Sequence, residues 1–322
     1  MLRTLSIALS ALSLAAQLSG GPPLYTVMAT LPFRVDGQPL RAFAFDKARN
    51  RLYAGSNRGL FWVDLSEPKP RVKGPIIRKN IVRIEFAPEL SRVYYITPDE
   101  VGYADLDRFG ESHQLIANLV PRDLVYEPTR REVYVSTRDP RLLVFDGQTS
   151  RREDDVPLPG WYAVELESVP GRVFFSLGDR DGLYTLDAAT HHVAPWAVTG
   201  RVVTPARIEA DPAGQYLFLS YYREIVAIDI ARATVVGRVV TFSTPAIAFD
   251  PGERLLIATW NNDPPPTKVM AYRVDAEGLT LAAELENPDV GRSGVEPTNH
   301  GFIQAGALRL LVWTSQPHAP AR

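Results

Sequence analysis

The stretch Phe61-Trp62-Val63-Asp64 consists of apolar residues that end in an aspartate, and the same pattern returns down the chain at nearly equal intervals. The later copies are Tyr103-Ala104-Asp105, Val144-Phe145-Asp146, Tyr184-Thr185-Leu186-Asp187 and Ala227-Ile228-Asp229. Successive aspartates are 41, 41, 41 and 42 residues apart (64 to 105, 105 to 146, 146 to 187 and 187 to 229). A constant period near 40 indicates one small structural unit that is repeated around a ring or along a stack.

A second sequence pattern, of a turn between two apolar runs, recurs with the same period. An apolar run ends at a turn, often with Asp-Pro, and a run rich in Val, Leu and Tyr follows, as in Phe86-Ala87-Pro88 and then Arg92-Val93-Tyr94. Asp and Pro favour turns, and short β-branched and aromatic runs between turns are typical of strands. Each repeat is therefore predicted to hold four antiparallel strands, which we call A to D. In one repeat they are residues 206–210, 216–220, 225–229 and 234–240.

The repeat predicts an all-β fold. A four-stranded sheet of this size cannot bury both of its faces alone, and packing such sheets radially around an axis gives a β-propeller. A solenoid is the competing repeat architecture, but its units are usually shorter or helical. We therefore expect a single β-propeller domain over residues 24–314, followed by a tail at 315–322.

The ends of the chain suggest how the ring closes. Six repeats are clear, and a seventh is incomplete, with residues 301–305 expected as strand A and 308–314 as strand B. Residues 24–33 resemble a strand D with nothing before it. Pairing the two ends would complete a seventh four-stranded blade, with an irregular strand C in 316–322. We therefore predict seven blades closed by the N-terminal strand, with six blades as the alternative.

The repeats resemble those of YVTN-type propellers of exported bacterial proteins. The resemblance lies in Leu52-Tyr53-Ala54-Gly55-Ser56-Asn57, in Val144-Phe145-Asp146-Gly147-Gln148-Thr149 and in Ala233-Thr234-Val235-Val236-Gly237, and it extends over most of residues 24–314. It implies the propeller fold. It does not imply one function, because that family includes both enzymes and binding proteins.

The first sixteen residues have the pattern of a signal peptide. Arg3 supplies the positive start, Leu5 to Leu14 is apolar, and small residues follow at Ala15 and Ala16. The apolar stretch is too short to span a membrane. The expected location of the mature chain is therefore extracytoplasmic, either periplasmic or secreted, with no membrane association after cleavage.

Composition narrows the class of partner. The net charge of −2 argues against a nucleic-acid-binding protein that relies on bulk positive charge. The chain has no cysteine, so it has no disulfide, and about 306 residues after cleavage are enough to bury a large core. No nucleotide-binding or phosphate-binding fingerprint occurs, and we expect no cofactor, no metal site and a monomer.

Arginines gather in two kinds of connection that should emerge on one face if strand A is innermost. The D-to-A connections contain Arg41, Arg83, Arg122 and Arg207, and the B-to-C connections contain Arg58, Arg138, Arg180, Arg223 and also Asn262. Guanidinium groups bind carboxylate and phosphate oxygens bidentately. The sequence therefore predicts a non-catalytic protein that binds a small anionic molecule or an extracytoplasmic partner protein at this face. The alternative is that the arginines only pair with neighbours such as Asp139, Asp179 and Asp181.

An enzyme is the rival interpretation. His300 lies just before the expected seventh strand A, and Glu296 precedes it by four residues. A histidine titrates near neutral pH and can act as a general base, with Glu296 as its orienting partner. Together with the arginines, this pair would suit a lactonase-like or lyase-like site at the mouth of the central channel.

Overall fold

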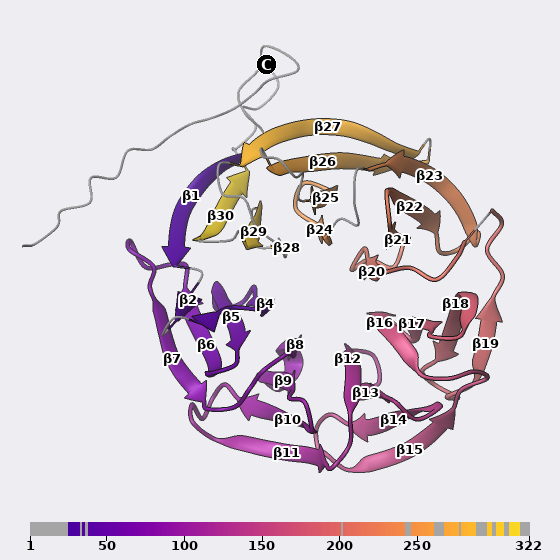
Figure 1. Ribbon diagram of the computed structural model, residues 1–322, viewed down its shortest axis with the longest axis horizontal. Coiled ribbons are helices and arrows are strands. Elements are labelled where there is room, and N and C mark those ends of the chain that lie inside the picture. The colour runs from indigo at the N-terminus through magenta and orange to yellow at the C-terminus, as the bar shows by residue number, and fades with distance from the viewer. Residues whose placement is uncertain are drawn as a thin grey trace, which may run out of the picture.

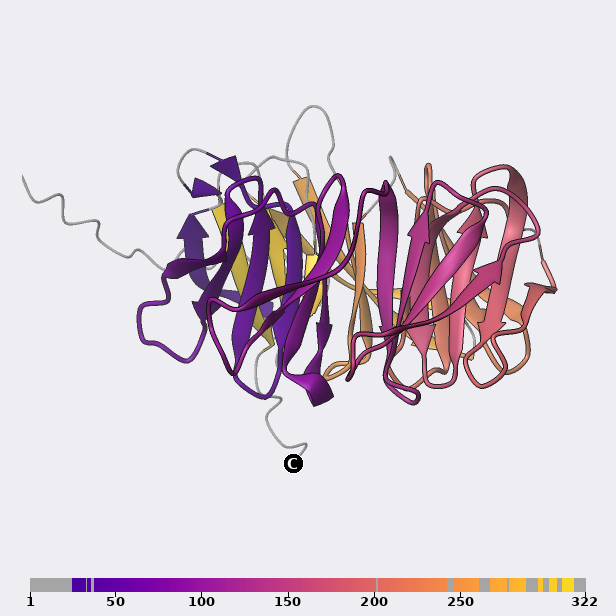
Figure 2. The same ribbon diagram turned by 90° about the horizontal axis from the view of Figure 1, so that it is seen from below.

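The computed structural model describes residues 25–32, 34–35, 38–200, 202–241, 246–260, 267–276, 278–287, 295–297, 301–305 and 309–315. Their strands form four-stranded antiparallel sheets arranged as blades around a central axis (Figure 1). Seen from the side, the ring is a disc whose strands run between its two faces (Figure 2). The prediction of an all-β propeller is confirmed.

In the described residues, six blades are built from four consecutive strands each, and we number them 1 to 6 in chain order. The innermost strands are β4 (Ala42–Asp46), β8 (Arg83–Ala87), β12 (Pro121–Glu127), β16 (Ala163–Val169), β20 (Arg207–Ala210) and β24 (Ala246–Asp250). The second strands are β5 (Arg51–Ser56), β9 (Arg92–Ile96), β13 (Glu132–Thr137), β17 (Arg172–Leu177), β21 (Tyr216–Tyr221) and β25 (Leu255–Trp260). The third strands are β6 (Gly59–Asp64), β10 (Glu100–Asp105), β14 (Arg141–Asp146), β18 (Arg180–Asp187), β22 (Glu224–Asp229) and β26 (Thr267–Asp275). The outermost strands are β7 (Val72–Ile77), β11 (Ser112–Ala117), β15 (Arg152–Pro157), β19 (Val193–Trp196), β23 (Thr234–Val240) and β27 (Gly278–Asn287).

One further sheet, blade 7, joins the two ends of the described chain. It consists of β28 (Val295–Pro297), β29 (Gly301–Ala305), β30 (Arg309–Ser315) and, as the outermost strand, β1 (Tyr25–Pro32). Strand β1 pairs antiparallel with β30, from Tyr25 opposite Ser315 to Pro32 opposite Arg309. The sheets with four strands therefore number seven when this shared sheet is included, and six when only consecutive strands are counted. The structure confirms that the N-terminal strand pairs with the C-terminal blade.

The strand roles predicted for blade 7 were wrong by one position. Residues 301–305 and 308–314 were expected as the first and second strands, but β29 and β30 are the second and third strands. The innermost strand is β28, which has only three residues and contains Pro297. It is too short to show the apolar strand pattern on which the prediction relied. The third strand expected in 316–322 falls outside the described residues, and β30 fills its place in the sheet.

The apolar cores lie between neighbouring blades. Seven clusters of buried apolar side chains occur in the described part of the chain, and each draws from two adjacent blades. In one of them, Val125 and Tyr134 of blade 3 pack with Leu166 and Phe175 of blade 4. Successive innermost strands touch one another all the way round, from β4 to β28 and back to β4. Strand A is therefore innermost in blades 1 to 6, which is the condition for the arginine-bearing connections to share one face.

Two minor elements complete the description. A two-stranded sheet pairs β2 (Arg34–Val35) with β3 (Gln38–Pro39), and the 3-10 helix η1 spans Pro88–Leu90. Within the residues that the structure describes, no helix has both the length and the apolar character needed to cross a membrane.

The aspartate that repeats in the sequence closes the turn between the third and outermost strands. The Asp187 carboxylate accepts hydrogen bonds from the backbone N–H groups of Ala189 (3.1 Å) and Thr190 (2.9 Å). The Asp229 carboxylate accepts one from the Arg232 N–H (2.9 Å) and another from the Arg232 guanidinium (3.0 Å). Aspartate favours such turns because its short side chain reaches the backbone two or three residues later. The motif is therefore structural.

Replacing this aspartate should weaken one turn without changing the fold. We expect Asp229→Ala to lower the free energy of unfolding by about 1 kcal/mol, because the Arg232 backbone N–H loses its acceptor. Asp229→Asn retains an acceptor oxygen and should lose less. Arg232→Ala removes only an exposed guanidinium and should be nearly neutral. Urea denaturation followed by circular dichroism measures all three, and an unaltered Asp229→Ala midpoint would contradict the assignment.

Candidate binding site

Two sets of connections emerge on one face of the disc, which we call the loop face. It carries the connections from each outermost strand to the next innermost strand, and the turns between the second and third strands. The predicted arginines in the described residues all belong to these connections or to the strand ends beside them: Arg41, Arg58, Arg83, Arg122, Arg138, Arg180, Arg207 and Arg223. The structure then separates them by what their side chains contact.

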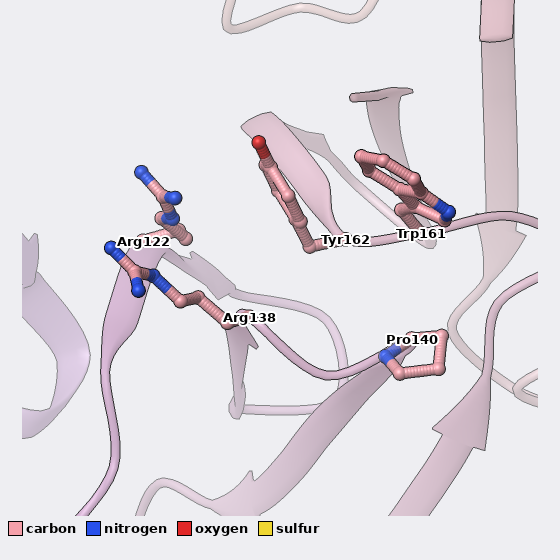
Figure 3. A pocket seen from close by; sticks show the side chains of 5 residues that line it. All are labelled: Arg122, Arg138, Pro140, Trp161 and Tyr162. Atoms are coloured by element: carbon pink, nitrogen blue, oxygen red, sulfur yellow. The ribbon is translucent and has the colours of Figure 1, made fainter. Parts of the chain in front are cut away.

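The loop face holds a pocket of about 460 Å³ between blades 3 and 4. It is lined by Arg122, Arg138, Pro140, Trp161 and Tyr162 (Figure 3). The structure thus brings together two of the predicted arginines. Sequence reasoning missed the two aromatic residues. The signal that could have found them is the pair Trp-Tyr directly before a buried innermost strand, just after the turn residues Pro159 and Gly160.

A β-bulge directs Arg122 toward the pocket. In the pairing of β12 with β13, Pro121 lies opposite Thr137 and Asp123 lies opposite Ser136, so Arg122 is the extra residue. A bulge turns a side chain out of the regular alternation of a strand. The Arg122 guanidinium lies over the Tyr162 ring, 4.7 Å from its centroid. This cation–π contact orients the guanidinium without neutralising its charge.

The aromatic pair is tied to the neighbouring turn of blade 4. The Trp161 backbone N–H donates to the Asp179 carboxylate (2.9 Å), and the Gly178 N–H donates to the Tyr162 carbonyl (3.0 Å). The Tyr162 ring stands between Arg122 and Trp161 (Figure 3). The backbone that positions the pocket is therefore held by hydrogen bonds, while the Trp161 indole remains largely exposed.

The pocket carries net positive charge. Among the described residues, neither Arg122 nor Arg138 has an ion-pair partner, and the nearby carboxylates are taken by other groups. Asp139 pairs with Arg141 (3.0 Å) rather than with Arg138. Two free guanidinium groups beside aromatic rings can hold a carboxylate or phosphate group by bidentate hydrogen bonds. The lining residues include no carboxylate and no imidazole, so this pocket has no group to accept a proton near neutral pH.

Arg83 and Arg207 contact carboxylates near the axis of the ring instead. Arg83 forms an ion pair with the buried Asp123 and another with Glu165 at 3.5 Å. Arg207 approaches Glu165 at 3.3 Å. For these two arginines the alternative expectation, that they only pair with carboxylates, is the better description. Asp123 lies on the innermost strand next to that of Arg83, and Glu165 lies on the one next to that of Arg207.

The other predicted residues are dispersed. Arg41 and Arg58 are exposed on blade 1, Arg180 approaches Asp179 at 3.8 Å, and Arg223 lies over the ring of Tyr222 at 5.1 Å. Asn262 and His300 lie outside the described residues. In chain order residues 298–300 separate β28 from β29, so the premise that His300 precedes an innermost strand is wrong. Glu296 is in β28, opposite Ile303.

The innermost strands carry further carboxylates that sequence reasoning also missed. The Asp123 carboxylate accepts a hydrogen bond from the Leu166 backbone N–H (2.7 Å), and Glu209 accepts one from Phe249 (3.1 Å). Glu85 accepts one from the Tyr126 backbone. Each bond joins an innermost strand to that of the next blade. The sequence pattern that could have indicated these groups is the spacing of charged residues along the innermost strands. Arg83 and Glu85, like Glu165 and Glu167, are two residues apart and therefore share one face of a strand.

These inward carboxylates have perturbed acidities. Burial raises the pKa of Glu85, of Asp123 and of Glu209 to about 7 in each case, although the charge of Arg83 partly opposes the shift. Burial, with the negative charges of Glu209 and Glu85, raises the pKa of Glu167 well above its ordinary value. In the described residues no group of three or more His, Cys, Asp or Glu side chains is placed to hold a metal ion.

By its fold the chain is a β-propeller, and comparison with solved structures places it beside WD40 propellers. A chain in the crystal structure of the mitotic checkpoint complex matches with a TM-score of 0.71 and 12% identity, over 94% of this chain and 98% of that chain. The WD40 β-propeller domain of Doa1 matches with a TM-score of 0.68 and 12% identity, over 91% of this chain and 98% of that chain. No protein-family model matches the sequence, and no curated protein matches it. At this identity the likeness concerns the fold alone.

Proposed function

We propose that this chain is a non-catalytic binding protein that holds an anionic group of a small molecule or partner protein between Arg122 and Arg138. The observation that carries the proposal is this pair of guanidinium groups, which lack an ion-pair partner among the described residues and lie beside two aromatic rings. The fold resembles WD40 domains, which are typically non-catalytic protein-binding scaffolds, and this favours partner binding in general.

The composition of the pocket favours binding over catalysis. An enzyme must bring a base, an orienting group and an anion-stabilising group to one point. The pocket supplies the anion-stabilising arginines but no carboxylate or imidazole. A binder needs only matching shape and charge, and the two aromatic rings add apolar surface for the rest of the ligand.

Three features of the setting are part of the proposal. Export to an extracytoplasmic compartment is supported by Arg3 and the apolar stretch after it. A YVTN-type origin of the blades is supported by the repeat residues between Leu52 and Asp64. We propose that the propeller acts as a monomer, because a closed ring of blades buries its apolar surface within one chain.

Loss of either pocket arginine should weaken anion binding. With citrate as the probe in isothermal titration calorimetry, we expect Arg122→Ala and Arg138→Ala each to raise Kd about tenfold, since one charge-assisted hydrogen bond contributes about 1.5 kcal/mol or more. Arg122→Lys keeps the charge but loses the bidentate geometry, so its Kd should be intermediate.

The matched control is Arg108→Ala, an exposed arginine in the turn between β10 and β11, on the opposite face. It should bind citrate like the parent protein. Thermal melting of each variant checks that the fold is retained. Citrate affinity that is the same in the parent, in Arg122→Ala and in Arg138→Ala would reject the pocket as the anion site.

A further inference from the structure

We propose that the pocket is one end of a longer docking surface across blades 3, 4 and 5, and that its partner is an extended acidic segment of another protein with apolar side chains between its acids. This inference rests on the proposed function, because the anionic group held by Arg122 and Arg138 becomes one carboxylate of that segment. We call this surface the docking band, and it consists of Arg122, Arg138, Trp161, Tyr222, Arg223 and Val240.

The docking band is continuous because hydrogen bonds link the loops of the three blades. The Trp161 N–H donates to Asp179 in the turn of blade 4 (2.9 Å). From the same turn region, the Arg180 carbonyl accepts a hydrogen bond from the Thr204 hydroxyl (3.0 Å) in the connection to blade 5. The Tyr221 hydroxyl of blade 5 donates to the Val203 carbonyl (3.2 Å) in that connection.

The band carries the apolar side chains that are most exposed. Among the large hydrophobic residues that the structure describes, the most exposed are Val240 (84%), Tyr222 (69%) and Trp161 (62%). All three lie at the loop face of blades 3 to 5, and the Thr241 N–H donates to the Arg223 carbonyl (2.8 Å), which holds the end of β23 beside Tyr222. Exposed apolar residues that gather on one face mark an interaction site.

Arginine accompanies an aromatic ring at both ends of the band. Arg122 lies over Tyr162 in the pocket, and Arg223 lies over Tyr222 on blade 5. Among the described residues, Arg122, Arg138 and Arg223 have no ion-pair partner. An arginine stacked on a ring keeps its hydrogen-bonding edge available for a carboxylate.

Three of the acidic residues beside the docking band are paired with other arginines. Asp139 pairs with Arg141 (3.0 Å), Asp179 approaches Arg180 (3.8 Å), and Glu224 pairs with Arg238 (3.1 Å). Among the described residues Asp181 has no ion-pair partner and makes only a long contact with the Thr204 hydroxyl (3.4 Å). The three arginines of the band outnumber this one carboxylate, so the charge left available is positive, which complements an acidic partner.

Separation of the charges favours a chain over a compact ion. The two arginines of the pocket belong to blade 3, while Arg223 belongs to the turn between β21 and β22 of blade 5, with all of blade 4 between them. One small anion reaches a single end of the band. An extended segment can place carboxylates at both ends and direct apolar side chains toward Trp161, Tyr222 and Val240, because alternate side chains of an extended chain face the same way.

The test uses a fluorescein-labelled 12-residue peptide of alternating Glu and Leu, with a Lys and Leu peptide and a 12-nucleotide oligouridine as comparison probes. Fluorescence anisotropy is measured with the full-length protein at low and high salt. We expect the acidic peptide alone to bind, and high salt to weaken its binding. Arg122→Ala, Tyr222→Ala and Arg223→Gln should each raise its Kd about tenfold, whereas Arg108→Gln on the opposite face should not.

Citrate affinity separates this inference from the function on which it rests. Tyr222→Ala and Arg223→Gln should bind citrate like the parent, because they lie away from the pocket. If the peptide responds to Arg122→Ala but not to the blade 5 variants, the long band is rejected and the pocket stands. Equal binding of the lysine peptide, tighter binding of oligouridine, or no peptide binding to a protein that binds citrate would also reject the band. Citrate binding that ignores Arg122 and Arg138 would reject the proposed function itself.

Discussion

Deleting residues 24–33 is expected to destabilise the propeller by about 5 kcal/mol or more, which is comparable with the whole stability of many domains. The deletion removes β1, the outermost strand of blade 7, and leaves the outer edge of β30 unpaired from Arg309 to Ser315. Two buried side chains are lost with it, Tyr25 (1% exposed) and Leu31 (3% exposed). Removal of one large buried side chain alone typically costs about 2–5 kcal/mol.

The loss extends beyond blade 7 because β1 contacts both neighbouring blades. Tyr25 belongs to the core between blades 6 and 7, and its hydroxyl donates to the buried carboxylate of Asp250 (2.9 Å) at the end of β24. Leu31 belongs to the core between blades 7 and 1. Without β1, both cores open and Asp250 loses a donor. In a closed ring, one missing strand therefore weakens two interfaces.

Differential scanning calorimetry measures this effect, with deletion of residues 1–16 as the matched control, which should melt like the parent. Tyr25→Phe keeps the ring but removes the hydroxyl that reaches Asp250, and it should cost about 1–2 kcal/mol. A synthetic peptide of residues 22–33 added to the truncated protein should raise its Tm, because a ligand of the native state stabilises that state. A truncated protein that melts like the parent would disprove closure by β1.

The regular blades were predictable from the sequence because their turn chemistry and strand pattern agree. In blade 5 the predicted strands 206–210, 216–220, 225–229 and 234–240 differ from β20, β21, β22 and β23 by no more than one residue at either end. Aspartates such as Asp229 fix the turns, and apolar runs fix the strands between them. The local sequence preferences and the overall fold therefore agree in this part of the chain.

Blade 7 shows where such signals fail. Its innermost strand β28 has three residues, and its pairing with β29 comes from the ring rather than from a strand pattern. Arg309 begins β30 as Arg51 begins β5, yet β5 is a second strand and β30 is a third strand. The resemblance was local, while the role of a strand in the sheet depends on what packs beside it. Tertiary context therefore overrides the local pattern at the closure.

The candidate site was predictable as a face but not as a set of contacts. Both Arg83 and Arg122 lie at the start of an innermost strand, yet Arg83 contacts carboxylates near the axis of the ring while Arg122 reaches the pocket. In the strand pairings Arg83, opposite Ile96, corresponds to Asp123, opposite Ser136, so Arg122 lies one residue earlier, at the bulge. A shift of one residue along a strand reverses the direction of a side chain. The composition of the segment does not indicate which of the two directions a given arginine takes.

Neutralising carboxylates of the innermost strands should stabilise the protein at alkaline pH. Unfolded glutamate titrates near 4.3, whereas burial raises the pKa of Glu85 and of Glu209 to about 7 in the folded protein. Between these values the folded state binds more protons than the unfolded state, so the free energy of unfolding falls as pH rises from about 4.5 to 7. This stabilising contribution is complete below about pH 4 and is lost above about pH 7.

Glu85→Gln and Glu209→Gln remove the free-energy cost of ionising a buried carboxyl group. Each variant keeps an acceptor oxygen for a backbone N–H, that of Tyr126 for Glu85→Gln and that of Phe249 for Glu209→Gln. We expect each variant to be about 2 kcal/mol more stable than the parent at pH 8 and nearly equal to it at pH 4.5. Arg83→Met should do the reverse, because it leaves the buried Asp123 without a counter-charge and leaves Glu165 only Arg207. Breaking such a pair costs about 3–5 kcal/mol, and the loss should be greatest at pH 8, where the carboxylates are ionised. Urea denaturation at several pH values compares the slopes. If the stability of the parent rises between pH 5 and 7 in step with that of both glutamine variants, the inward carboxylates are not the groups that set its pH dependence.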